Sequence, residues 1–230
     1  VSPDGTHLAF IGRPNQSEPW QIYLMNRQTR DIRQLPVVSQ QPTLLIFDDN
    51  QSLLIVDLVV DNSAIYRLQL DENMRLASEE KVAGFPFISH LSSATEEGDW
   101  LINAVDDLQG TAKLYGWNAD SGEFKLLQAR SSVVDHIYRS VYSPSGQRLA
   151  SAVLFNASDF RLEVQDVQSK HTLYSEKIAG RVDRLEWLDE ESLIVLDDKQ
   201  GLVFVELASN SQRVMLEHGD EKNQDFSIVR

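Results

Sequence analysis

Short turn-forming clusters recur along this chain at an even spacing, and this periodicity restricts the possible folds more than any other feature. The clusters are centred on residues 4, 49, 97, 145 and 190, so neighbouring centres lie 45 to 48 residues apart. Their sequences are Pro3-Asp4-Gly5, Asp48-Asp49-Asn50, Glu96-Glu97-Gly98, Pro144-Ser145-Gly146 and Asp189-Glu190-Glu191. Even repeats of this length are typical of arrays in which each repeat is one supersecondary unit.

Each turn is flanked by short runs rich in β-branched, aromatic and leucine residues, which predict β-strands. Four runs recur in each period, and no stretch keeps helical spacing over a dozen residues. The runs that follow the turns are 7–11, 53–56, 100–104, 148–153 and 193–196, and those before the next turns are 44–47, 91–94, 137–142 and 182–187. Four short strands per period predict an all-β fold, a β-propeller of four-stranded antiparallel blades. A β-sandwich is the weaker alternative, because it predicts no fixed period.

The repeats divide the chain into five units within one predicted domain, residues 1–230. The units are approximately 1–41, 42–86, 87–134, 135–180 and 181–224. The first unit begins at its turn and lacks an inner strand, whereas residues 225–230 look like an inner strand without a turn. Two readings stay open: residues 225–230 close a five-bladed ring by completing the first unit, or the chain is a window on a longer propeller. Closure would cover two open strand edges, and it is slightly favoured.

The first unit also carries a recognisable motif. Ser2-Pro3-Asp4-Gly5, then Ile22-Tyr23-Leu24-Met25-Asn26 and Arg33-Gln34-Leu35, resembles the TolB-type propeller repeat, also called the WD40-like or PD40 repeat. The fourth unit keeps the turn as Ser143-Pro144-Ser145-Gly146. The resemblance implies a propeller with six or seven blades in most relatives, usually a binding or scaffold domain and often periplasmic. It names no catalytic residue.

Composition excludes several classes of function. With 21 Lys and Arg against 35 Asp and Glu, the net charge of −14 disfavours nucleic acid and anionic lipid surfaces. The chain has no cysteine and no apolar run long enough to span a membrane. Signatures of hydrolases, zinc proteases and phosphate-binding loops are absent. The acidic pairs Asp48-Asp49, Asp106-Asp107 and Asp197-Asp198 are expected to be solvated turns rather than metal ligands. We therefore expect neither a metal nor a cofactor.

The innermost strand of each unit is the best place to look for a ligand site, because inner strands line the channel of a propeller. Three residues before the turn centre stand Ile46, Tyr142 and Trp187, which are expected to face between blades. Polar residues at the strand starts should converge on the channel mouth from different blades, as ligand-binding groups do. These ligand-binding candidates are His90, Tyr138, Asp183, Arg139 and Arg184.

Aromatic residues in predicted loops form a second set of candidates. Trp20 follows the connection 13–20, while Phe85 and Phe87 flank Pro86 between two units. Because aromatic residues on loops often anchor protein partners, these three are candidates for protein binding. Packing between blades is the competing interpretation for Phe85 and Phe87.

The sequence favours a non-enzymatic binding or sensing module that offers its channel mouth to a protein partner or small ligand. The family resemblance implies the extracytoplasmic, periplasmic part of a bacterial envelope protein or of a membrane-anchored transcriptional regulator. The alternative is the propeller of an enzyme, either a serine peptidase with its catalytic domain elsewhere or a polysaccharide lyase. Three metal-binding groups converging in the channel would favour the lyase.

Overall fold

The computed structural model of this chain describes residues 1–37, 39, 41–59, 62–94, 99–105, 111–130, 136–155 and 159–217. Every regular element in these ranges is a β-strand, so they contain no helix that could cross a membrane. The strands are β1 (His7–Gly12), β2 (Gln21–Asn26), β3 (Ile32–Leu35), β4 (Pro42–Phe47), β5 (Ser52–Asp57), β6 (Ser63–Leu70), β7 (Leu76–Phe85), β8 (Phe87–Ser93), β9 (Asp99–Val105), β10 (Ala112–Asn118), β11 (Phe124–Arg130), β12 (His136–Tyr142), β13 (Arg148–Phe155), β14 (Asp159–Asp166), β15 (Thr172–Ile178), β16 (Val182–Trp187), β17 (Ser192–Asp197), β18 (Gly201–Glu206) and β19 (Ser211–Glu217).

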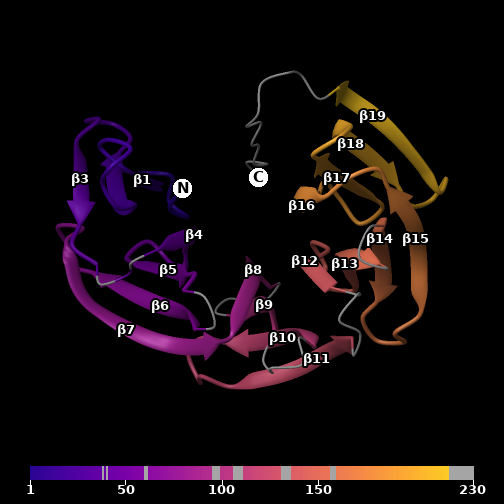
Figure 1. Ribbon diagram of the computed structural model, residues 1–230, viewed down its shortest axis with the longest axis horizontal. Coiled ribbons are helices and arrows are strands. Elements are labelled where there is room, and N and C mark those ends of the chain that lie inside the picture. Colours follow the sequence, from indigo (N-terminus) through magenta and orange to yellow (C-terminus); the bar gives the residue numbers. More distant parts are fainter. Residues whose placement is uncertain are drawn as a thin grey trace. The chain divides into compact units, whose positions relative to one another are not determined.

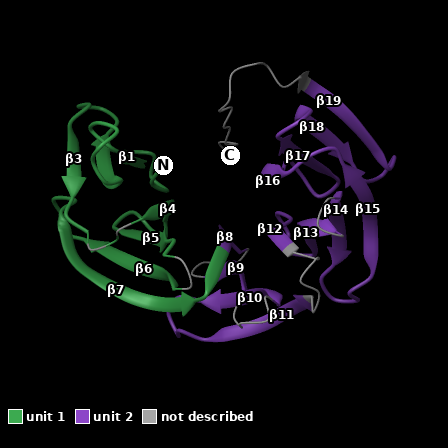
Figure 2. Ribbon diagram, viewed as in Figure 1, with its two compact units in different colours: residues 1–88 green, residues 89–230 purple. Residues whose placement is uncertain are grey.

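The strands form five antiparallel sheets in which strands that are consecutive in sequence lie side by side (Figure 1). The first sheet is β1-β2-β3, and the others are four-stranded: β4 to β7, β8 to β11, β12 to β15 and β16 to β19. The chain divides into two compact units, residues 1–88 and 89–230, with the boundary inside β8 (Figure 2). The sheets confirm the all-β class expected from the repeats. Assignment of residues 1–230 to a single domain stays a prediction.

Apolar side chains fill the space between neighbouring sheets within each unit. In residues 1–88, Ile22 and Leu24 of β2 pack with Leu53 and Ile55 of β5. In residues 89–230, the sheet β12 to β15 is covered on both faces, because Leu149 and Ala150 belong to different apolar clusters. A sheet covered on both faces needs apolar residues at successive positions, which explains why the second strand of each repeat reads as a continuous apolar run.

The two Ser-Pro-x-Gly turns have the same hydrogen bonds although they lie in different units. The N–H of Gly5 donates to the carbonyl of Ser2, as the N–H of Gly146 does to Ser143. Both glycines adopt positive φ angles, 70° and 74°, which a residue with a side chain rarely adopts. The shared motif thus encodes a shared turn.

The structure corrects one position in the alignment of the inner strands. Phe47 pairs with Leu53 as Tyr142 pairs with Leu149 and Trp187 with Leu193. Phe47 belongs to the apolar cluster between the first two sheets, whereas Ile46 does not. The expectation that Ile46 is equivalent to Trp187 was wrong by one residue, because alignment on turn centres does not resolve where each turn begins.

Two expectations fall where the structure gives no description. The turn at residues 96–98 and the inner strand at residues 225–230 both lie outside the described ranges. Completion of the sheet β1-β2-β3 by residues 225–230 therefore remains a prediction.

Candidate functional site

A β-bulge near the start of each of three inner strands determines where the candidate side chains point. In β12 the pairing with β13 shifts between Ile137 and Arg139, so that Tyr138 is the extra residue. In β16 it shifts between Val182 and Arg184, so that Asp183 is the extra residue. The strand β4 has the same shift at Thr43. Since bulges redirect side chains, these repeated irregularities set the geometry of the candidate site.

His90 of β8 and Arg139 of β12 form the centre of the site. The guanidinium Nη1 of Arg139 lies 3.1 Å from Nδ1 of His90, and its Nε donates to the carbonyl of Val182 at 3.2 Å. A guanidinium group has donors only, so Nδ1 of His90 must be the acceptor. The hydrogen of this neutral imidazole is consequently on Nε2.

Burial holds His90 in its neutral form. Its side chain is almost entirely enclosed, with a residue exposure of 8%. Desolvation, followed by repulsion from Arg139 and Arg184, lowers the pKa of His90 well below its usual value of 6.5. Two of the five candidates, His90 and Arg139, are therefore in direct contact, and the charge of Arg184 acts on the same imidazole.

The other two candidates lie in different environments. The ring of Tyr138 packs against Phe160 of β14, with the ring centroids 5.8 Å apart. Asp183 accepts a hydrogen bond from Nε of Arg181 at 3.0 Å and forms an ion pair with the same side chain. These contacts give Tyr138 a packing role and Asp183 a surface ion pair.

The aromatic candidates all lie in residues 1–88. Trp20 is 46% exposed and lies under the guanidinium group of Arg13, at 4.7 Å from its ring centroid. Phe87 is 45% exposed at the start of β8, whereas Phe85 is half-buried at the end of β7. Trp20 and Phe87 offer apolar surface to a partner, and their role in protein binding stays a prediction.

One acidic pair was misread from the sequence. Asp197 is fully buried rather than solvated, and its carboxylate accepts hydrogen bonds from the backbone N–H groups of Gly180, Lys199 and Gln200. Asp57 of β5 accepts a hydrogen bond from the N–H of Gln41 in the same way, at 2.6 Å. Asp48 forms an ion pair with Arg67, and Asp106-Asp107 lies outside the described residues. The recurring role of Asp57 and Asp197 is structural, because it fixes the segment that precedes an inner strand.

No group of three or more His, Asp or Glu side chains among the described residues is arranged to hold a metal ion.

Solved structures share this fold at low sequence identity. TolB from Acinetobacter baumannii matches with a TM-score of 0.66 and 14% identity, over 92% of this chain and 51% of its own. A puromycin-hydrolyzing peptidase of Mycobacterium tuberculosis matches with a TM-score of 0.65 and 14% identity, over 97% of this chain and 38% of its own. A puromycin hydrolase matches with a TM-score of 0.63 and 12% identity, over 97% of this chain and 38% of its own.

These matches confirm, at the level of the fold, the β-propeller and the resemblance to TolB that the repeats indicated. This chain spans about half or less of the length of those proteins. No protein-family model and no curated protein sequence matches it.

Proposed function

We propose that this propeller chain is a non-enzymatic binding module and that the cluster of His90, Arg139 and Arg184 receives a carboxylate group of its ligand. The observation that carries the proposal is the hydrogen bond from Arg139 to a buried, neutral His90. With Nδ1 occupied as an acceptor, the cluster combines the Nε2–H donor with two guanidinium groups. Such an array suits an anionic acceptor, because charge-assisted hydrogen bonds to carboxylates are the strong ones.

The position of the cluster supports a binding role. Its members come from within three inner strands, β8, β12 and β16, so a framework of paired strands holds them. Sites built on strands hold their geometry better than sites built on loops. The TolB-like fold is consistent with a binding domain of a periplasmic protein, which is the setting we propose. A sensory role within a membrane-anchored regulator is the finer form of the same proposal.

A matched pair of peptides tests this proposal. Acetyl-Ala-Ala with a free carboxylate should bind the full chain more tightly than the same peptide with an amidated end, as measured by isothermal titration calorimetry. Arg139→Gln should weaken binding of the free acid by about tenfold or more, the scale of one charge-assisted hydrogen bond. Arg161→Gln is the control, because Arg161 covers the ring of Phe155 instead. Equal affinity of the two peptides would refute the proposal.

An enzymatic setting is the second candidate, and a specific observation favours it. Two of the structural neighbours are a puromycin-hydrolyzing peptidase and a puromycin hydrolase, and each is covered over 38% of its length. In this reading the chain would be the accessory propeller of a hydrolase, and the His90 cluster would contact the substrate. Sequencing the complete reading frame decides between the two, since a hydrolase domain encoded beside this segment would establish the second.

A further inference from the structure

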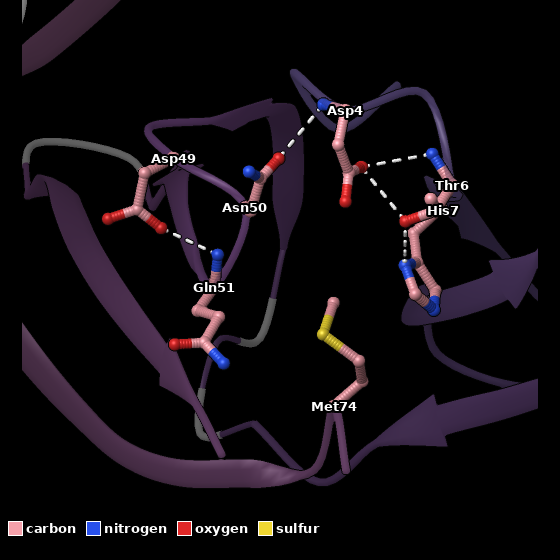
Figure 3. A pocket seen from close by; sticks show the side chains of 7 residues that line it. All are labelled: Asp4, Thr6, His7, Asp49, Asn50, Gln51 and Met74. Carbon is pink, nitrogen blue, oxygen red and sulfur yellow. Dashed lines mark hydrogen bonds between the residues drawn. The ribbon is translucent and has the colours of Figure 1, made fainter. Parts of the chain in front are cut away.

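An open hollow of about 470 Å³ lies in residues 1–88, beside the turns that precede β1 and β5 (Figure 3). Its lining is polar and acidic, with one thioether. It is formed by Asp4, Thr6, His7, Asp49, Asn50, Gln51 and Met74. This hollow lies outside the His90 cluster, which belongs to residues 89–230. Any ligand that it takes would therefore be additional to the proposed carboxylate.

Residues 89–230 contain an equivalent pair of turns with the same hydrogen bonds. The N–H of Asp4 donates to the side-chain oxygen of Asn50 at 2.9 Å, and the N–H of Ser145 donates to the carboxylate of Glu190 at 2.6 Å. The β-strand pairing supports this equivalence, because His7 pairs with Asn26 as Arg148 pairs with Asp166. His7 and Arg148 therefore occupy corresponding positions.

In residues 89–230 the side chain of Arg148 joins the turn at Ser145 to the turn at Glu190. Its Nη1 donates to the backbone carbonyl of Glu190, and its Nη2 forms an ion pair with the carboxylate of Glu191 at 2.7 Å. Only 24% of the Arg148 side chain is exposed. This pair of turns thus binds a guanidinium group that the chain itself supplies.

In residues 1–88 the shorter His7 stands where Arg148 stands, and the nearby guanidinium group of Arg27 donates to the carbonyl of Gly5 at 2.8 Å instead of joining the two turns. Nδ1 of His7 lies 2.8 Å from the hydroxyl of Thr6, and its Nε2 lies 3.5 Å from the amide of Asn26. Figure 3 shows His7 at one side of the hollow, with the side chains of Gln51 and Met74 on other sides. The position that Arg148 fills in one unit is consequently a hollow in the other.

The groups around the hollow suit a cation. Gln51 corresponds to Glu191 and offers an amide oxygen, while Asp4 adds a carboxylate where the other unit has Ser145. One oxygen of Asp4, Oδ1, accepts hydrogen bonds from Ser2 and Thr6, and Figure 3 shows the two from Thr6. These hydrogen bonds lower the pKa of Asp4 to about 2, so this carboxylate is charged under ordinary conditions.

We propose that the hollow between Asp4, His7 and Gln51 binds an alkylguanidinium group, as an arginine side chain of a polypeptide partner or as a small free guanidinium compound. The ligand would occupy the place of Arg148 in the second unit, with its guanidinium group beside the Asp4 carboxylate. Its methylene stem would pass the thioether of Met74. Planar guanidinium groups fit such sites better than ammonium groups, because they donate in two parallel directions.

Binding is tested with a charged peptide and its neutral isostere. Acetyl-Gly-Arg-Gly amide should shift the NMR signals of the full chain, with a Kd of about 1 mM or tighter from the guanidinium group and its stem together. The same peptide with citrulline in place of arginine should bind about tenfold more weakly or not at all. Equal binding of the two peptides, or no binding of the arginine peptide, would overturn the proposal. Agmatine distinguishes the sources: tighter binding of the peptide identifies a polypeptide, and equal binding identifies a small compound.

Two exchange variants locate the site within the chain. His7→Arg should fill the hollow as Arg148 does, and should abolish binding while the melting temperature stays the same or rises. Arg148→His should create a second hollow next to Glu190 and Glu191, and should raise the stoichiometry from one peptide to two. Binding that persists in a folded His7→Arg variant would overturn the assignment to this hollow, independently of the result for the His90 cluster.

Discussion

The buried carboxylate of Asp197 accepts a hydrogen bond from the backbone N–H of Gly180 at 2.7 Å. Gly180 lies in the connection between β15 and β16, and Asp197 is the last residue of β17. Two further backbone N–H groups, those of Lys199 and Gln200, donate to the other oxygen of the same carboxylate. The Asp197 side chain therefore holds in place both the segment that leads into the inner strand β16 and the turn that follows β17.

This relationship leaves no room for a side chain at position 180. A Cβ atom on Gly180 would overlap Oδ1 of Asp198 and lie 2.8 Å from Oδ1 of Asp197, and hydrogen bonds hold both carboxylates in place. Gly180→Ala should therefore lower the free energy of unfolding by about 1–3 kcal/mol, the usual cost of overpacking. Urea denaturation followed by circular dichroism measures it. Gly116→Ala is the control, since the atom nearest to its added Cβ would be a side-chain carbon of Leu127, at 3.5 Å. Equal stability of the two variants would contradict this account.

Trp187 of β16 joins its own sheet to the sheet β12 to β15 through packing and a hydrogen bond. It is 2% exposed, and its indole N–H donates to the carbonyl of Val141 at 3.1 Å. Trp187→Ala should cost about 3–5 kcal/mol, the typical loss for a large buried aromatic side chain. Trp187→Phe keeps most of the packing and should cost less. A loss below about 1 kcal/mol for Trp187→Ala would show that the packing of this face is incorrectly described.

His90 should make stability depend on pH in the mildly acidic range. Its pKa in the folded state lies well below the ordinary value of 6.5, so the unfolded chain binds the proton first. The contribution of His90 is complete above pH 6.5 and is lost as pH falls, by up to about 1.4 kcal/mol per pH unit. Unfolding free energies from pH 5 to 8 measure this slope.

The matched variant for that experiment is His90→Gln, whose amide oxygen can still accept the hydrogen bond from Arg139. It lacks the titrating group, so subtraction of its pH profile isolates His90 from the other titrating groups. A difference profile in which the original chain gains stability towards low pH would mean that folded His90 is charged.

Trp20 should account for most of the tryptophan fluorescence that iodide, a quencher dissolved in water, can quench. The chain has four tryptophans, and Trp100, Trp117 and Trp187 are each at most 3% exposed. Trp20→Ala should therefore abolish most quenching by iodide while stability changes by no more than about 1 kcal/mol, since its cation–π contact is exposed. Strong residual quenching in the folded variant would show that another tryptophan is accessible.

Much of the fold could be predicted from the sequence because its signals are local. The Ser-Pro-x-Gly turns at Ser2 and Ser143 have identical hydrogen-bond patterns, and the apolar runs beside them became strands. Turn chemistry and strand patterning act between residues that are close in the chain, so a single sequence displays them. The period of 45 to 48 residues then specified a repeated β-sheet unit.

The tertiary structure decided which side chains meet. Tyr138 and Asp183 are the extra residues of two bulges and contact Phe160 and Arg181, whereas Arg139 meets His90. Because a bulge shifts the alternation of a strand by one residue, simple counting from the turn cannot predict it.

Burial of charge was likewise a tertiary outcome. Asp197 reads as part of an exposed turn, yet backbone N–H groups that packing brings to it satisfy its carboxylate. The hollow beside His7 also needed the structure, since it is recognised only against Arg148 in the equivalent pair of turns. The sequence by itself thus determined strands, turns and their period, which depend on neighbours along the chain. Contacts between groups 17 to 49 residues apart depend on register and packing, and only the folded chain decides them.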